Sequence, residues 1–142
     1  MQMEAEGMFS AMLFAIAVVA LAQFALYYLR AMLTGVACQP VDRRVFEAAQ
    51  VEEPALCGDD FGKLLSLHAL TPRLEGARSS LLPVRCYYQA MKKLSNLCGG
   101  ISPAVAEWTR REQLLCARFA AVQVDRRLHN NLAHAAAMDS NQ

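Results

Sequence analysis

The sequence lacks most of the motifs that identify an activity. It contains no Gly-rich phosphate-binding loop, no dinucleotide-binding fingerprint and no CxxCH haem-attachment motif. Its five cysteines include no CxxC pair and no spacing typical of a metal site. We therefore expect no cofactor, no metal and no small-molecule substrate, and we expect the protein not to be an enzyme.

Charge is missing entirely from residues 8–29, which form one apolar run. A helix rises about 1.5 Å per residue, so this run reaches about 30 Å, the thickness of the hydrocarbon core of a bilayer. The run is apolar on all sides, whereas a core helix of a small domain usually keeps a polar face. We expect a transmembrane helix over residues 8–34, with Tyr27 and Tyr28 at the headgroup level.

The residues that flank this run differ in charge. The seven residues before it contain Glu4 and Glu6 but no Lys or Arg, whereas Arg30, Arg43 and Arg44 follow it. The positive-inside rule then places the N-terminus outside and the C-terminal domain in the cytoplasm. The expected location is a plasma membrane or a bacterial inner membrane.

The start of the apolar run resembles the processing site of type IV pilin-like proteins, at Glu6-Gly7-Met8-Phe9. The resemblance covers the first thirty residues. The family's signal has a glutamate five residues into the mature chain, where this sequence has Met12, and the basic leader is also missing. The resemblance implies an alternative, an exported structural subunit whose leader is cleaved before Met8.

Small residues recur along the apolar run at intervals of four. Gly7, Ala11 and Ala15 follow this spacing, which lets two membrane helices approach closely, and Gln23 can bond to a partner helix. The alternative is that Ala is simply common here and that Gln23 bonds locally. We expect the lipid bilayer and another membrane protein, or a second copy of the chain, as partners.

The chain after the apolar run is mildly basic. It carries 14 Lys and Arg against 11 Asp and Glu, because two of the 13 acidic residues are Glu4 and Glu6. This excess suits the inner face of an anionic leaflet. It is too small and too mixed to predict a nucleic-acid partner.

The cysteines favour a reducing compartment. Their number is odd and they follow no disulfide framework, so we expect reduced thiols that behave as small buried hydrophobes. Cys86 and Cys98 fall on one expected helix, too far apart along it to form a disulfide.

The sequence predicts an all-α protein with one anchor and one domain. Residues 1–7 form a short acidic tail before the transmembrane helix, residues 35–58 form a juxtamembrane connector, and residues 59–142 form a helical extramembrane domain. The composition of residues 42–51 predicts a short helix within the connector.

Capping residues and helix breakers divide the domain into helices. Asp59-Asp60 can cap a helix that ends before Pro72. Ser79 or Ser80 can cap the next helix, which Gly99-Gly100 ends. No strand-like alternation is present, so we expect no sheet.

The last helix has the clearest start signal, Ser102-Pro103, and we expect it to run to about Ala135. Its apolar residues follow a three-four spacing that Glu112 and Arg126 interrupt, so we expect packing on its own domain rather than a long coiled coil. We expect Trp108 to anchor the core. The spaced residues are Val105, Trp108, Leu115, Phe119, Val122 and His129.

Titratable residues form no catalytic pattern. His129 and His134 are five residues apart, which is not the spacing that puts two metal ligands on one helix face. His68 lies on an apolar stripe, where a hydrogen-bonded core histidine is the usual outcome. No specific Cys–His pair is brought together by the sequence.

Two pairs of arginines on the last helix are candidate contacts for a partner or for lipid, namely Arg110, Arg111, Arg126 and Arg127. Arg111 can instead pair with Glu107, four residues earlier. Taken together, the sequence predicts a single-pass membrane-anchored adaptor or accessory subunit. It would act by tethering a helical module to the membrane.

Overall fold

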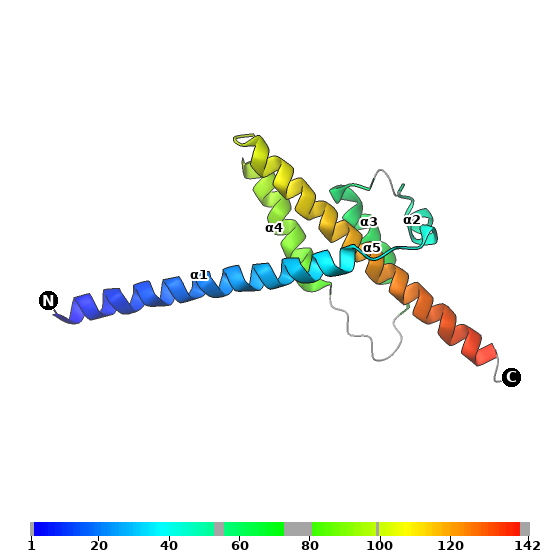
Figure 1. Ribbon diagram of the computed structural model, residues 1–142, viewed down its shortest axis with the longest axis horizontal. Helices are drawn as coiled ribbons and strands as arrows, with labels where there is room; N and C mark the ends of the chain where they lie inside the picture. The colour runs from blue at the N-terminus through cyan, green and yellow to red at the C-terminus, as the bar shows by residue number, and fades with distance from the viewer. Residues whose placement is uncertain (1, 53–55, 73–80, 99, 140–142) are drawn as a thin grey trace. The chain divides into compact units, whose positions relative to one another are not determined.

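The computed structural model describes residues 2–52, 56–72, 81–98 and 100–139 (Figure 1). Within these ranges all regular structure is helical and no strand occurs. The helices are α1 (Gln2–Ala37), α2 (Arg43–Ala49), the 3-10 helix η2 (Gly58–Asp60), α3 (Phe61–Leu70), α4 (Leu82–Cys98) and α5 (Pro103–Asp139). The expected all-α class is confirmed, with a long apolar helix first and a long helix last.

The chain divides into two compact units, Met1–Gly35 and Val36–Gln142. The first unit contains α1 up to Gly35. The segment Gly7–Ala37 of α1 is 31 residues long, and the most apolar part of it is exposed throughout. The helix is long and apolar enough to cross a bilayer. Polar groups near its end are satisfied locally, as where the Thr34 hydroxyl donates to the Arg30 carbonyl at 2.8 Å.

The second unit is built around α5, which packs against α4, α3, η2 and α2. The middle of α5 carries small side chains that are fully buried, including Cys116, Ala117 and Ala120. Small side chains let the neighbouring helices approach closely. Phe61 of α3 and Tyr88 of α4 complete this core, with ring centroids 4.4 Å apart.

α4 and α5 lie side by side and form a helical hairpin (Figure 1). The amide groups of Ile101 and Ser102 both donate to the Cys98 carbonyl at 3.0 Å, which closes the last turn of α4. α5 then begins at Pro103, as the start signal predicted. It continues to Asp139, four residues beyond the expected end, because no Gly or Pro interrupts it.

The buried face of α5 agrees only in part with the predicted one: Phe119 and Val122 are buried as expected, whereas the first half of the helix differs. Trp108 was expected to anchor the core but is 40% exposed, whereas Glu112 was expected to interrupt the packing and is 0% exposed. The buried face instead runs through Thr109, Glu112 and Cys116. Glu112 is accommodated because the Tyr87 hydroxyl of α4 donates to its carboxylate at 2.9 Å.

Local capping defines the short helices. The Asp42 carboxylate accepts the Arg44 amide at 3.0 Å and so caps α2. Asp60 accepts the Cys57 amide at 3.1 Å and thereby closes η2, but it makes no side-chain cap bond to α3. The expected caps Ser79 and Ser80 lie outside the described residues.

Candidate functional site

The predicted packing residues all lie on α1. The described side chains of Gly7, Ala11, Ala15 and Gln23 are exposed, and a Cβ added at Gly7 would meet no other atom. Ala15 and Gln23 border one shallow groove along the helix, together with Ile16, Val19 and Ala20. The groove gives α1 a face on which the ridge of another helix can pack.

The four predicted contact arginines do not form one surface. Arg110 and Arg111 are exposed near the start of α5, and Arg111 pairs with Glu107 at 3.1 Å. Arg126 is exposed about 24 Å further along the helix and donates to the Gln39 side chain. Arg127 is buried, which corrects the expectation that it belongs to an exposed basic face.

Arg127 instead joins two helices. Its guanidinium donates to the His68 carbonyl, in the last turn of α3, at 3.0 Å. Carbonyl groups at the end of a helix lack partners within that helix, and the helix dipole there favours a cation. Arg127 therefore stabilises the packing of α5 against the end of α3.

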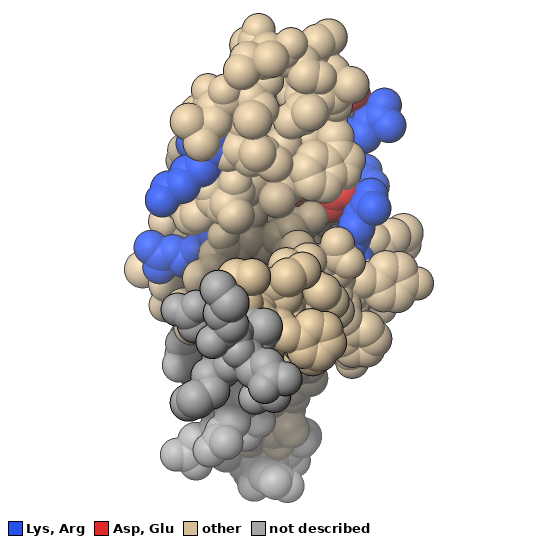
Figure 2. All heavy atoms as spheres, turned by 90° about the vertical axis from the view of Figure 1, so that its left-hand side faces the viewer, with Lys and Arg blue, Asp and Glu red and all other residues tan. Residues whose placement is uncertain are grey.

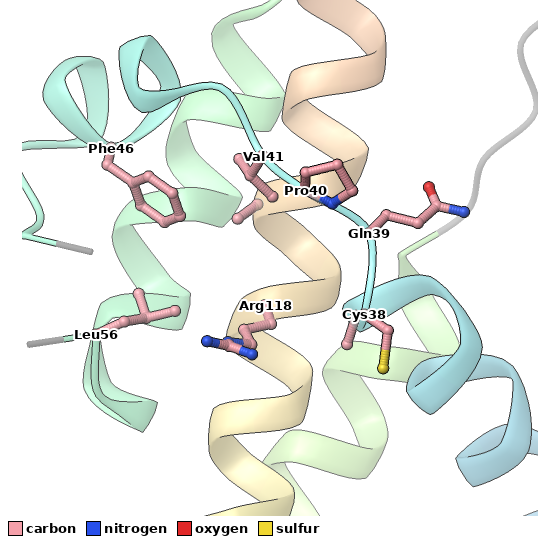
Figure 3. Close-up of a pocket in the computed structure, with 9 residues that line it drawn as sticks. Cys38, Gln39, Pro40, Val41, Phe46, Leu56 and Arg118 are labelled. Atoms are coloured by element: carbon pink, nitrogen blue, oxygen red, sulfur yellow. The ribbon is translucent and has the colours of Figure 1, made fainter. Parts of the chain in front are cut away.

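A cavity of about 220 Å³ opens between the connector and α5 (Figure 3). Its walls are both apolar and polar, and Figure 3 shows the Phe46 ring facing this space and the Arg118 side chain extending from α5 between Leu56 and Cys38. Gln39 points away from the cavity toward its bond with Arg126. The residues that line the cavity are Ala37, Cys38, Gln39, Pro40, Val41, Phe46, Leu56, Arg118 and Ala121.

The lining of the cavity combines apolar side chains with one cation. Phe46 is buried and Val41 is half-buried, so they offer a small apolar surface, and Arg118 can bind a carboxylate or a phosphate. The other polar side chains of the lining are the exposed thiol of Cys38 and the outward-pointing Gln39. The cavity thus offers a small apolar surface beside one guanidinium group.

The cysteines differ in exposure. Cys38, Cys57 and Cys86 are exposed, Cys98 is half-buried, and only Cys116 is buried, so burial of all five thiols was a wrong expectation. Burial, together with the neighbouring Glu112 carboxylate, raises the pKa of the Cys116 thiol to about 12. This thiol stays protonated at neutral pH and is a poor nucleophile.

The three histidines differ in burial and in their contacts. His68 is buried at the end of α3, as expected, whereas His129 is exposed and its Nδ1 lies 3.1 Å from the Asp125 carbonyl. His134 is exposed near the end of α5. Among the described residues, no three His, Cys, Asp or Glu side chains are grouped so that they could hold a metal ion.

Charge is distributed in small groups. On the face drawn in Figure 2, most of the visible charged side chains are Lys and Arg, and they stand in separate groups. At the start of α3, hydrogen bonds from the Cys57 amide and from Lys63 lower the pKa of the Asp60 carboxyl. These hydrogen bonds stabilise the chain at the start of α3.

Sequence reasoning missed the Tyr87–Glu112 bond, the Arg127–His68 bond and the cavity at Arg118. A charged residue within an apolar spacing, as at Glu112, was the one available signal. Comparison with known proteins adds no further guide: no family model matches this chain, and neither a curated protein nor a solved structure shows significant similarity to it.

Proposed function

We propose that this protein is a single-pass membrane-anchored interaction protein, an adaptor or accessory subunit. α1 is its anchor, and the unit Val36–Gln142 is the helical module that it holds at the membrane. The N-terminus lies outside and the module lies in the cytoplasm.

The exposure of α1 carries this proposal. Large side chains such as Phe9, Phe14 and Leu21 are exposed along it. Removing one such side chain from water is worth about 1.5–3 kcal/mol, so the whole helix strongly favours an apolar surrounding. A lipid bilayer supplies that surrounding on every side, as a helix without a polar face requires.

The length of the connector supports tethering. Only five residues, from Cys38 to Asp42, separate α1 from α2. Even fully extended they span at most about 18 Å, so α2 stays close to the end of the anchor. Confinement of this kind raises the effective concentration of the module for a partner in the same membrane.

The flanking charges support the orientation. Arg30, Arg43 and Arg44 follow the apolar segment and are exposed, whereas residues 1–7 contain no Lys or Arg. Cations near the end of a span favour the cytoplasmic side. The pilin-like alternative places the module outside and requires cleavage between Gly7 and Met8.

The test is association in the membrane. The full chain is expressed in cells, its membranes are washed at alkaline pH, and its partners are isolated in mild detergent. We expect the chain to stay with the membrane and Ala11→Leu with Ala15→Leu to remove the copurified partner. Ser10→Leu with Ala17→Leu changes two small residues on a different face of α1 and serves as the matched control.

Two results would contradict the proposal. One is release of the chain by the alkaline wash, since a spanning helix resists it. The other is a mature protein that starts at Met8, which the mass of the isolated chain reveals and which would favour the pilin-like alternative.

A further inference from the structure

The end of the α4–α5 hairpin exposes large apolar side chains. Leu97 in the last turn of α4 is 75% exposed and Ile101 in the connecting turn is 85% exposed. Trp108, in the second turn of α5, is 40% exposed. In Figures 1 and 2 this end lies at the top, and on the face drawn in Figure 2 no charged side chain is visible at its extremity.

Cations follow directly behind this apolar end. Residues 92–111 contain Lys92, Lys93, Arg110 and Arg111 but only one acidic residue, Glu107. The rest of the unit from Val36 to Gln142 has 9 Lys and Arg against 10 Asp and Glu, so its whole positive excess lies at this end of the hairpin.

The cations differ in how they are held. Lys92 pairs with Asp59 at 3.3 Å and Arg111 pairs with Glu107 at 3.1 Å. Lys93 and Arg110 are exposed, and no hydrogen bond or ion pair of theirs occurs among the described residues. These two side chains are therefore available to an anionic surface.

We propose that the end of the hairpin, defined by Leu97, Ile101, Trp108, Lys93 and Arg110, inserts into the headgroup region of an anionic lipid bilayer. Apolar side chains with cations directly behind them bind such a surface. The free energy gained by burying the apolar side chains adds to that gained by attracting the cations to anionic headgroups. An indole ring favours the same interfacial depth.

The contact gives the module a second attachment to the membrane that holds it, so the inference rests on the proposed anchoring. A protein partner of the same surface would have to supply both an apolar face and acidic side chains. The lipid bilayer does not have to be recruited, since α1 already holds the module beside it.

Trp108 is the only tryptophan of the chain, so its fluorescence reports on this surface alone. The full chain is placed in nanodiscs of phosphatidylcholine or of phosphatidylcholine mixed with phosphatidylglycerol. We expect the emission of Trp108 to shift to the blue in the mixed discs and to be quenched by brominated acyl chains there. Raised ionic strength reduces both effects, because salt screens the charges.

Two pairs of variants separate the contributions. Leu97→Ser with Ile101→Ser abolishes the quenching, whereas Leu70→Ser with Leu82→Ser, at two other exposed leucines, leaves it unchanged. Lys93→Gln with Arg110→Gln weakens the docking equilibrium about tenfold or more. Arg85→Gln with Arg126→Gln, at two exposed arginines outside residues 92–111, is the matched control of equal charge and changes it little.

An identical Trp108 spectrum in both kinds of disc overturns the inference. So does a spectrum that follows protein concentration rather than lipid charge, since that identifies a second copy as the occupant. A chain that fails to enter the discs contradicts the anchoring instead, and the same reading with added vesicles then decides on the hairpin separately.

Discussion

The Tyr87 hydroxyl of α4 donates a 2.9 Å hydrogen bond to the Glu112 carboxylate of α5, and both residues are buried. The bond joins the two helices of the hairpin at the place where sequence alone predicted a disruption. A buried carboxylate is costly unless it is hydrogen-bonded, so this pair fixes how α4 and α5 pack.

Tyr87→Phe should lower the free energy of unfolding of the second unit by about 1–3 kcal/mol, because a buried acceptor loses the hydrogen bond from the Tyr87 hydroxyl. Urea unfolding of the full chain in detergent, followed by near-UV circular dichroism, measures the change. Tyr87→Phe combined with Glu112→Leu should cost less than the sum of the two single changes. Additive losses would mean that the two groups do not interact.

Arg127→Met should destabilise the unit by about 2–3 kcal/mol, because the buried guanidinium bonds to the end of α3. Arg126→Met, at the adjacent exposed arginine, should cost less than about 1 kcal/mol. The same unfolding measurement compares the two. Equal losses would argue against a structural position for Arg127.

The Cys116 thiol should make stability fall at alkaline pH. Its pKa is raised by burial from the ordinary 9.0 to about 12, so below pH 9 the native and the unfolded chain both hold the proton. Between these values only the unfolded chain releases it, and stability declines by up to about 1.4 kcal/mol per pH unit.

Comparison with Cys116→Ala isolates this effect, since that variant should show a shallower decline over the same range. A thiol reagent at pH 8 should also modify the exposed Cys86 and leave Cys116 unmodified until the chain unfolds. Rapid native labelling of Cys116 would show that it is not buried.

The Asp60 carboxyl should act at the other end of the pH scale. Bonds from the Cys57 amide and from Lys63 lower its pKa below the ordinary 3.8. Its contribution to stability is therefore present above about pH 4 and is lost as the pH falls through its native pKa. Unfolding curves should show Asp60→Asn less stable than the unchanged chain at pH 7, with the difference shrinking below pH 4. A constant difference would contradict this account.

The sequence predicted those parts of the fold that depend on local signals. The unbroken apolar run gave α1, and Ser102-Pro103 gave the start of α5. The packed face of α5 was predicted correctly at Phe119 and Val122 but not in the first half of the helix, because the middle of α5 is surrounded by several helices and has no single apolar stripe. For this reason Trp108, which was expected to be buried, is exposed, and Glu112, which was expected to interrupt the packing, is buried.

The candidate sites were predictable to the same limited degree. The sequence was sufficient to place the candidate packing residues of α1 on one helix. Their contacts could not be predicted, because these depend on a partner. Arg127 was grouped with Arg126 because the two are adjacent in sequence, although adjacent helical positions differ by about 100°. The cavity at Arg118 is lined by segments about 75 residues apart in the sequence, and no local sequence pattern predicts that they lie together.

The orientation of the exposed thiol of Cys86 relative to the membrane tests the central proposal most directly. Cys38, Cys57 and Cys98 are replaced by Ser and the buried Cys116 is kept, so that Cys86 is the accessible thiol of the native chain. A second version replaces Cys86 by Ser as well and carries Gln2→Cys. Both are exposed to a membrane-impermeant maleimide in right-side-out vesicles, before and after permeabilisation.

The account predicts labelling of Gln2→Cys in closed vesicles and labelling of Cys86 only after the vesicles are opened. Labelling of Cys86 in closed vesicles would contradict it, because the helical module would then lie outside.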